Sequence, residues 1–334
     1  MVLWHPLKTA IERSPSGNKK INAAPPLILC CSFLILIALG ALALKLPFAT
    51  NEPISWIQSA FTATSAVTVT GLVVVDTGST FTPFGQGVIA LLIQLGGLGL
   101  MTFAVVTLLA LGNKVGFIQK TVTKAAFNQT DTSTLLSTAK SVLLFAIIVE
   151  SLGVVILTLY WLPELGLQTS FFHALFYTIS AFNNAGFALS PNSLMQYVDD
   201  PVINLTITGL FIIGGLGFTV LMDVYKSKRW AALSTYSKLM LISTVIINIV
   251  ALVLIYVIEY DNPKTLQPLS EVGKWLAAWF QAVTPRTAGF NTIATVAYTH
   301  LTLPNIYPIE DPVAAISLQK KHIPSTTATN IDGT

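Results

Sequence analysis

Three glycines at a constant spacing are the residues in this sequence best suited to ion chemistry. Each follows an aromatic residue by ten positions, and the pairs are Phe61 and Gly71, Phe176 and Gly186, and Trp279 and Gly289. Glycine lets the backbone adopt conformations that turn carbonyl oxygens toward a lumen. A ring of such oxygens can replace the water around a monovalent cation, and this chemistry needs no charged side chain.

Backbone groups beside the three glycines belong to the same predicted filter. The flanking positions are Val69, Thr70, Asn184, Ala185, Thr287 and Ala288. Asn183 and Asn184 could offer amide oxygens to an ion or hydrogen-bond their own backbone, and the sequence leaves both readings open. Arg286, three residues before Gly289, is expected to pair with an exterior carboxylate such as Glu271, because charges inside a membrane usually pair.

The composition is that of a membrane protein. Of 334 residues, 53% are hydrophobic and 10% are charged, whereas soluble domains carry about 25% charged residues. So few charges exclude soluble enzymes, nucleic-acid binders and disordered hubs.

A membrane enzyme would need a nucleophile and base, or clustered metal ligands, at one depth. Glu150 and Asp223 are the only carboxylates well inside apolar runs, so no catalytic residue is predicted. Glu150 is either a functional intramembrane carboxylate or a partner in an interhelical hydrogen bond.

Five apolar runs predict membrane spans, since about 20 residues at a rise of roughly 1.5 Å cross a hydrocarbon core. They cover residues 27–44, 84–111, 141–160, 202–225 and 239–258. Three shorter segments, residues 54–67, 169–182 and 272–283, each lead into one of the glycines. We expect half-helices that enter the membrane and turn back beside a polar pathway. Amphipathic surface helices are the alternative.

The loop charges predict the orientation of the chain. Under the positive-inside rule the basic loops face the cytoplasm, and so does the N-terminus. These basic residues are Lys8, Arg13, Lys19, Lys20, Lys114, Lys120, Lys124, Lys226, Lys228, Arg229 and Lys238. The opposite loops carry Glu52, Asp76, Glu164, Asp199, Asp200, Glu259, Asp261 and Glu271, and an acidic exterior attracts cations.

Two crossings in each repeat return the chain to its starting side. Successive repeats therefore have one orientation and are related by an axis along the membrane normal, which favours a central pore. The predicted fold is an all-α polytopic membrane protein with tandem parallel helix–pore loop–helix repeats. A secondary transporter with inverted repeats is the alternative.

Glycines also lie inside two of the predicted spans, where they act as hinges or allow close helix packing. These glycines are Gly96, Gly97 and Gly99 in the second span and Gly214, Gly215 and Gly217 in the fourth. The predicted organisation is a cytoplasmic segment (1–26), two repeats (27–111 and 135–225), a partial third repeat (239–296) and a polar tail (297–334).

Several of these motifs resemble the Ktr/Trk/HKT potassium transporters, and most closely the membrane subunit of Ktr. The resemblance rests on SAVTVTGLVVVDTG (65–78), FNNAGF (182–187), TPRTAGFN (284–291) and the two GGLG helices, in this order between residue 27 and about residue 297. It implies K⁺ as the transported ion, Na⁺ as an activating or coupling ion, and four repeats that each contribute one filter glycine. It also implies a homodimer in the bacterial cytoplasmic membrane, controlled by a cytosolic ring of nucleotide-binding regulatory subunits, with no nucleic-acid partner.

The tail departs from the family pattern. In the first two repeats, the span after the glycine loop contains a glycine pair; we call this span the inner helix. No glycine pair occurs near Ala315, where the inner helix of the third repeat would have one, and the stretch contains Pro304, Pro308, Pro312 and Pro324. The expectation from sequence is that the third inner helix and the fourth repeat are missing through truncation or a frameshift, and that the chain by itself transports poorly.

Overall fold

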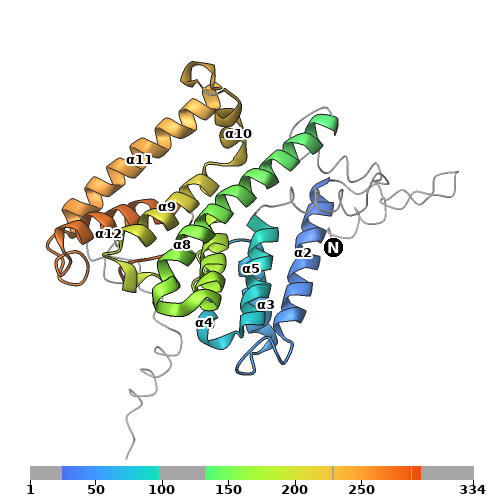
Figure 1. Ribbon diagram of the computed structural model, residues 1–334. Helices are drawn as coiled ribbons and strands as arrows, with labels where there is room; N and C mark the ends of the chain where they lie inside the picture. The colour runs from blue at the N-terminus through green and yellow to red at the C-terminus, as the bar shows by residue number, and fades with distance from the viewer. Residues whose placement is uncertain (1–24, 98–131, 228, 287, 295–334) are drawn as a thin grey trace, which may run out of the picture.

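The computed structural model describes residues 25–97, 132–227, 229–286 and 288–294, and within these ranges it contains helices and no β-strand (Figure 1). The all-α prediction is thus confirmed for the described residues. Almost all of the predicted N-terminal segment (1–26), the whole tail (297–334) and the second half of the run at 84–111 lie outside them.

The first group of helices comprises α2 (Pro25–Leu44), α3 (Trp56–Val67), α4 (Thr77–Thr80) and α5 (Pro83–Gly97). Helix α3 begins with a capping box, in which the Ser55 hydroxyl accepts from the Gln58 N–H and the Gln58 side chain accepts from the Ser55 N–H. Helices α2, α3 and α5 contact one another and enclose an apolar core that includes Leu44, Ile89 and Ile93. The predicted half-helix at 54–67 therefore begins at a local cap and ends at Val67.

Helix α8 (Thr132–Phe182) joins two elements that the sequence separated. Its 51 residues include a single non-helical position, Gly166, with φ 71° and ψ 165°. The elements predicted at 141–160 and 169–182 are thus two helices that meet at a kink, since helix continues through Pro163 and the chain turns at Gly166. Figure 1 shows this turn beside α4, with α8 running between the α2–α5 group and the helices that follow.

The remaining α-helices are α9 (Pro201–Gly215), α10 (Phe218–Ser227), α11 (Thr235–Glu259) and α12 (Glu271–Val283). Short 3₁₀ turns occur at Met195–Tyr197, Trp230–Ala232 and Thr284–Arg286. The run at 202–225, predicted as one span, is broken. Gly217 has φ +80°, and the axes of its two helical parts differ by 95°.

By length and composition, two helices within the described residues are long and apolar enough to cross a membrane, Leu143–Phe182 and Thr235–Glu259. The bent pair Pro201–Gly215 and Val220–Ser227 makes a third if it is one span. Helix α2, with 20 residues, and α5, with 15, are apolar as well.

Helix α11 shows an arrangement typical of membrane proteins, with polar residues inside and apolar residues outside. Its buried residues are Ser237, Thr244, Asn248, Ile255 and Glu259. Large apolar side chains such as Leu239 and Val257 are 62% and 68% exposed. In lipid, polar groups must find partners within the protein whereas leucine and valine can face the acyl chains. The described helices therefore form a membrane-spanning protein.

Candidate filter site at three glycine loops

The first glycine loop follows directly from the end of α3. The N–H groups of Thr68, Val69 and Thr70 donate back to the carbonyls of Thr64, Ala66 and Ser65 at 2.9, 3.2 and 2.9 Å. Val69 has φ +55° and Gly71 has φ +79°. The chain therefore leaves the helix through two left-handed positions, the second of which is a glycine.

The second loop repeats this geometry at the end of α8. Asn183, Asn184 and Ala185 donate to the carbonyls of Ile179, Ala181 and Ser180 at 3.1, 3.0 and 2.7 Å. Asn184 has φ +59° and Gly186 has φ +73°, which match Val69 and Gly71 position by position.

The third loop is one residue tighter. After α12 the chain forms the 3₁₀ turn Thr284–Arg286, and the Ala288 N–H donates to the Thr284 carbonyl at 3.0 Å. Gly289 has φ +74°, and the flanking residue Thr287 lies outside the described residues.

The three glycines meet in space. A Cβ placed on Gly71 would collide with the Ala185 carbonyl oxygen and lie 3.6 Å from the Gly186 Cα. A Cβ on Gly186 would lie 2.6 Å from the Ala288 carbonyl oxygen and 2.9 Å from the Gly289 Cα. The first loop therefore abuts the second and the second abuts the third, with backbone carbonyls at both contacts. Segments more than 100 residues apart along the chain are brought together here.

Beyond the glycines, the second and third loops are hydrogen-bonded to each other. The Leu194 N–H donates to the Asn291 carbonyl at 3.0 Å, and the Asn291 N–H donates to the Ser193 hydroxyl at 3.2 Å. The helix before the third loop is also linked to the helix after the second, because the indole N–H of Trp279 in α12 donates to the Thr208 hydroxyl of α9 at 3.1 Å. These bonds hold the two loops in one unit.

Hydroxyl side chains that the sequence analysis missed close two of the loops. Ser180 Oγ donates to the Phe187 carbonyl at 2.8 Å, and Thr284 Oγ1 donates to the Phe290 carbonyl at 2.6 Å. Ser65 occupies the equivalent place in the first loop, but its buried Oγ has no hydrogen-bond partner among the described residues. A hydroxyl residue five or six positions before each glycine was the available signal.

Glycines in α5 and α9, the helices that follow the first two loops, lie against the ends of α3 and α8, the helices that precede these loops. A Cβ on Gly96 would overlap the Val67 carbonyl, and one on Gly214 would overlap the Phe182 carbonyl. Val67 and Phe182 each precede their filter glycine by four residues. Close packing therefore explains Gly96 and Gly214, whereas Gly217 lies at the break between α9 and α10. Gly215 ends α9 and Gly99 lies outside the described residues.

The two asparagines have structural partners. Asn183 Nδ2 donates to the Ile179 carbonyl at 2.9 Å and to Gln94 Oε1 at 2.7 Å. Asn184 Nδ2 donates to the Phe182 carbonyl at 3.3 Å. Gln94 Nε2 in turn donates to both carboxylate oxygens of Glu150, at 2.9 and 3.0 Å. Glu150 is thus engaged in an interhelical hydrogen bond, and Gln94 is a residue that the sequence analysis did not single out.

Glu271, at the start of α12, pairs with Lys274 through a 2.8 Å contact, and the Lys274 ammonium lies 4.0 Å from the centre of the Tyr260 ring. The hydrogen bond from Lys274 lowers the pKa of the Glu271 carboxyl. The side chain of Arg286 lies outside the described part of the structure, so its pairing with Glu271 stays a prediction.

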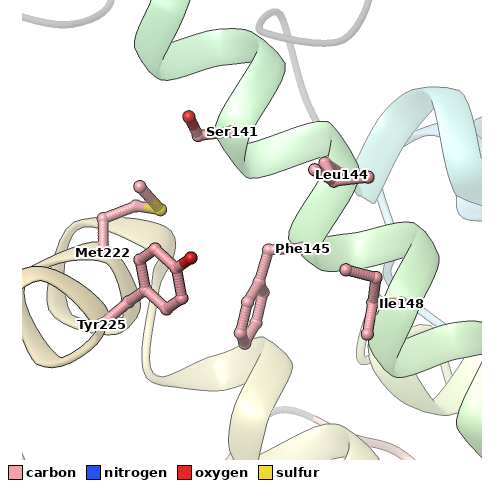
Figure 2. Close-up of a pocket in the computed structure, with 6 residues that line it drawn as sticks. All are labelled: Ser141, Leu144, Phe145, Ile148, Met222 and Tyr225. Atoms are coloured by element: carbon pink, nitrogen blue, oxygen red, sulfur yellow. The ribbon is translucent and has the colours of Figure 1, made fainter.

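A pocket elsewhere in the molecule does not suit an ion. It lies between α8 and α10 and is lined by Ser141, Leu144, Phe145, Ile148, Met222 and Tyr225 (Figure 2). Most of these side chains are apolar, and none belongs to the glycine loops. The described residues also contain no group of three or more His, Cys, Asp or Glu side chains that could hold a metal ion.

Fold and site together define a polytopic helical membrane protein in which three helices, α3, α8 and α12, end in convergent glycine loops. Residues 27–301 match the model of the TrkH family, described as a cation transport protein, and the chain belongs to this family.

Relatives with curated names share much of the sequence. The chain is 49% identical over 275 residues to Ktr system potassium uptake protein B of Bacillus subtilis, covering 82% of this chain and 62% of that protein. It is 43% identical over 288 residues to the protein of the same name in Vibrio alginolyticus, covering 85% and 63%. It is also 32% identical to the potassium/sodium uptake protein NtpJ of Enterococcus hirae, covering 83% and 62%. The chain thus spans less than two thirds of the length of these relatives.

Among solved structures, the potassium transporter TrkH from Vibrio parahaemolyticus matches with a TM-score of 0.61 and 21% identity, covering 86% of this chain and 55% of that one. At this identity the match establishes a shared fold.

Proposed function

We propose that the whole protein carries K⁺ across the bacterial cytoplasmic membrane through a channel-like pore. One observation carries the proposal: Gly71, Gly186 and Gly289, all at positive φ, meet with the carbonyls of Ala185 and Ala288 between them. Backbone oxygens in such an arrangement can replace the water around a monovalent cation. The names of two relatives, both potassium uptake proteins, support K⁺ as that cation.

The filter backbone in this proposal comprises the three glycines together with Val69, Thr70, Asn184, Ala185, Thr287 and Ala288. Helices α3, α8 and α12 lead into the three loops, so each loop receives the negative end of a helix dipole, worth about half an elementary charge. This field stabilises a cation without a carboxylate in its path. Gly96 and Gly214 allow the inner helices to lie against the short helices and thereby fix those dipoles.

The proposal extends to the assembly. Repeats at 27–111, 135–225 and 239–296 surround the pore with the N-terminus in the cytoplasm. Two copies associate in the bilayer, and a cytosolic ring of nucleotide-binding subunits regulates them. Na⁺ acts as a coupling or activating ion. The name of the potassium/sodium uptake relative supports Na⁺ only as a second ion that is taken up.

Growth on limiting potassium tests the activity. The chain is expressed in a bacterium that lacks potassium uptake, alone and fused to the part of the Bacillus subtilis relative outside the match. Rescue by a membrane-inserted form is the expected result, and an equal amount of its Gly186→Ser variant is the control. If every form inserts and none restores growth, K⁺ uptake is the wrong function.

A secondary transporter is the second candidate, and the break at Gly217 favours it. Discontinuous helices line the midplane sites of such proteins, and the two parts of the α9–α10 segment meet at 95°. Reporter fusions within residues 115–135 and 226–238 separate the candidates. Both fusions on the same side of the membrane support parallel repeats and a pore, whereas opposite sides support inverted repeats.

A further inference from the structure

A chain of three polar side chains runs from the second glycine loop to an apolar helix. Asn183 lies immediately after the end of α8, Gln94 is in α5, and Glu150 is in the earlier part of α8, within the candidate span Leu143–Phe182. The distances are 2.7 Å from Asn183 Nδ2 to Gln94 Oε1, and 2.9 and 3.0 Å from Gln94 Nε2 to the two Glu150 oxygens. These hydrogen bonds therefore link the second loop to α5 and to the earlier part of α8.

The direction of donation along this chain is determined at both ends. The Ile179 carbonyl can only accept, so the atom that Asn183 presents to it is the amide nitrogen, at 2.9 Å. That nitrogen also reaches Gln94, which must present its oxygen and therefore turns its amide nitrogen toward Glu150. A carboxylate accepts with both oxygens, so Glu150 completes the chain.

The position of Asn183 gives this chain a consequence for the filter. A Cβ on Gly97 would lie 2.4 to 2.6 Å from the Oδ1, Cβ and Cγ atoms of Asn183, so the side chain is held closely against α5. Asn183 is 8% exposed, and the next residue, Asn184, has the left-handed φ of +59°. Ala185 and Gly186 follow at once. A displaced Asn183 side chain would therefore shift the backbone that carries the filter carbonyls.

We propose that Glu150 is a positioning residue for ion selection, which acts through Gln94 and Asn183 to fix the second glycine loop. The role rests on the proposed function, since it presumes that the Ala185–Gly186 backbone contacts the ion. A carboxylate is costly in an apolar helix. Here both Glu150 oxygens accept from the Gln94 amide nitrogen, so the Gln94 amide oxygen is turned toward Asn183 at the second loop.

An exchange of the two side chains tests the proposal. Glu150→Gln places an amide opposite the Gln94 amide and removes one acceptor, and Gln94→Glu places two carboxyl groups face to face. In the double variant, the carboxylate now at position 94 accepts from both Asn183 and the amide now at position 150, so every donor regains an acceptor. Glu164→Gln, at an exposed position of the same helix, is the matched control.

Two readouts are measured for each variant in the form of the protein that rescues growth: K⁺ over Na⁺ preference in uptake, and hydrogen exchange of the peptide spanning residues 183–186. Each single variant at Glu150 or Gln94 is expected to lower the preference about fivefold or more, with the exchanged pair within about twofold of the parent. Backbone exchange rises in the single variants and returns to the parent value in the double variant. Glu164→Gln changes neither readout.

Unchanged preference and exchange in Glu150→Gln would overturn the proposal, as would a double variant no better than the single ones. Faster exchange with unchanged preference would reduce Glu150 to a structural role and overturn it too. A parent that shows no K⁺ preference defeats the proposed function instead. Hydrogen exchange on the purified chain then tests the contact by itself: faster exchange in Glu150→Gln leaves Glu150 a structural role in holding the second loop, and unchanged exchange removes that role as well.

Discussion

Replacing Gly186 with alanine should damage ion selection, and more strongly than the same change at Gly289. An L-residue in the left-handed region costs roughly 1–2 kcal/mol. The new Cβ would also lie 2.6 Å from the Ala288 carbonyl oxygen and 2.9 Å from the Gly289 Cα, closer than such atoms approach. Both neighbours are backbone, so the second and third loops must move apart.

Gly166→Ala is the matched control, because Gly166 has nearly the same φ, +71° against +73°, and no atom within 4 Å of its added Cβ. Both variants should lose folding free energy because an L-residue is disfavoured at positive φ, by roughly 1–2 kcal/mol in the left-handed region. The loss at Gly166 should be the larger one, because its ψ of 165° places it in a region essentially restricted to glycine. Only Gly186→Ala should also change the filter, by about 1.4 kcal/mol or more in the relative free energies of the two ions, which is a tenfold loss of K⁺ over Na⁺ preference.

The assay is K⁺ uptake into liposomes against increasing Na⁺, with thermal unfolding of the purified variants as the measure of stability. Equal spacing in the sequence predicts equal effects at all three glycines. The contacts instead predict a smaller effect at Gly289, where the nearest atom would lie 3.2 Å from the Cβ. Equal selectivity in Gly186→Ala and Gly166→Ala would refute the assignment of Gly186 to the filter.

Two further pairs of substitutions test the packing around the loops. Ser180→Ala removes a buried 2.8 Å hydrogen bond and should lower the free energy of unfolding by about 1–3 kcal/mol, whereas Ser65→Ala removes a hydroxyl without a partner among the described residues and should cost less; equal losses in thermal unfolding would contradict this difference. Gly214→Ala should reduce the amount of folded protein because its Cβ would overlap the Phe182 carbonyl, and Gly209→Ala, with no atom within 4 Å, should not; detergent-resistant protein measured by size-exclusion chromatography distinguishes them.

Local signals were enough to locate the short helices and the glycines. The segment predicted at 272–283 is observed as Glu271–Val283, because Ser270 caps its start and the apolar pattern ends before Pro285. Resemblance to a known family then supplied the expected role of the glycines. Their convergence could not be read from spacing alone, since it depends on the contacts among α3, α8 and α12 and their neighbours.

Other features depend on contacts between distant residues, which no local pattern encodes. Gln94 and Asn183 are 89 residues apart, and nothing near Gln94 indicates that its amide is oriented by Glu150. The break at Gly217 was missed because the sequence is apolar on both sides of this residue, and hydropathy does not register a single residue with positive φ. Asp223, the carboxylate inside the run at 202–225, accepts from the Ser234 N–H at 2.9 Å, across the turn between α10 and α11.

Crystals grown with Tl⁺ in place of K⁺ would locate the ion itself by anomalous scattering. The filter assignment predicts a peak in contact with backbone carbonyls where Gly71, Gly186 and Gly289 meet, including those of Ala185 and Ala288, and loss of that peak in Gly186→Ala. A peak only at the Glu150 carboxylate, or no peak at the glycine loops in a protein that transports K⁺, would contradict a carbonyl filter at this site.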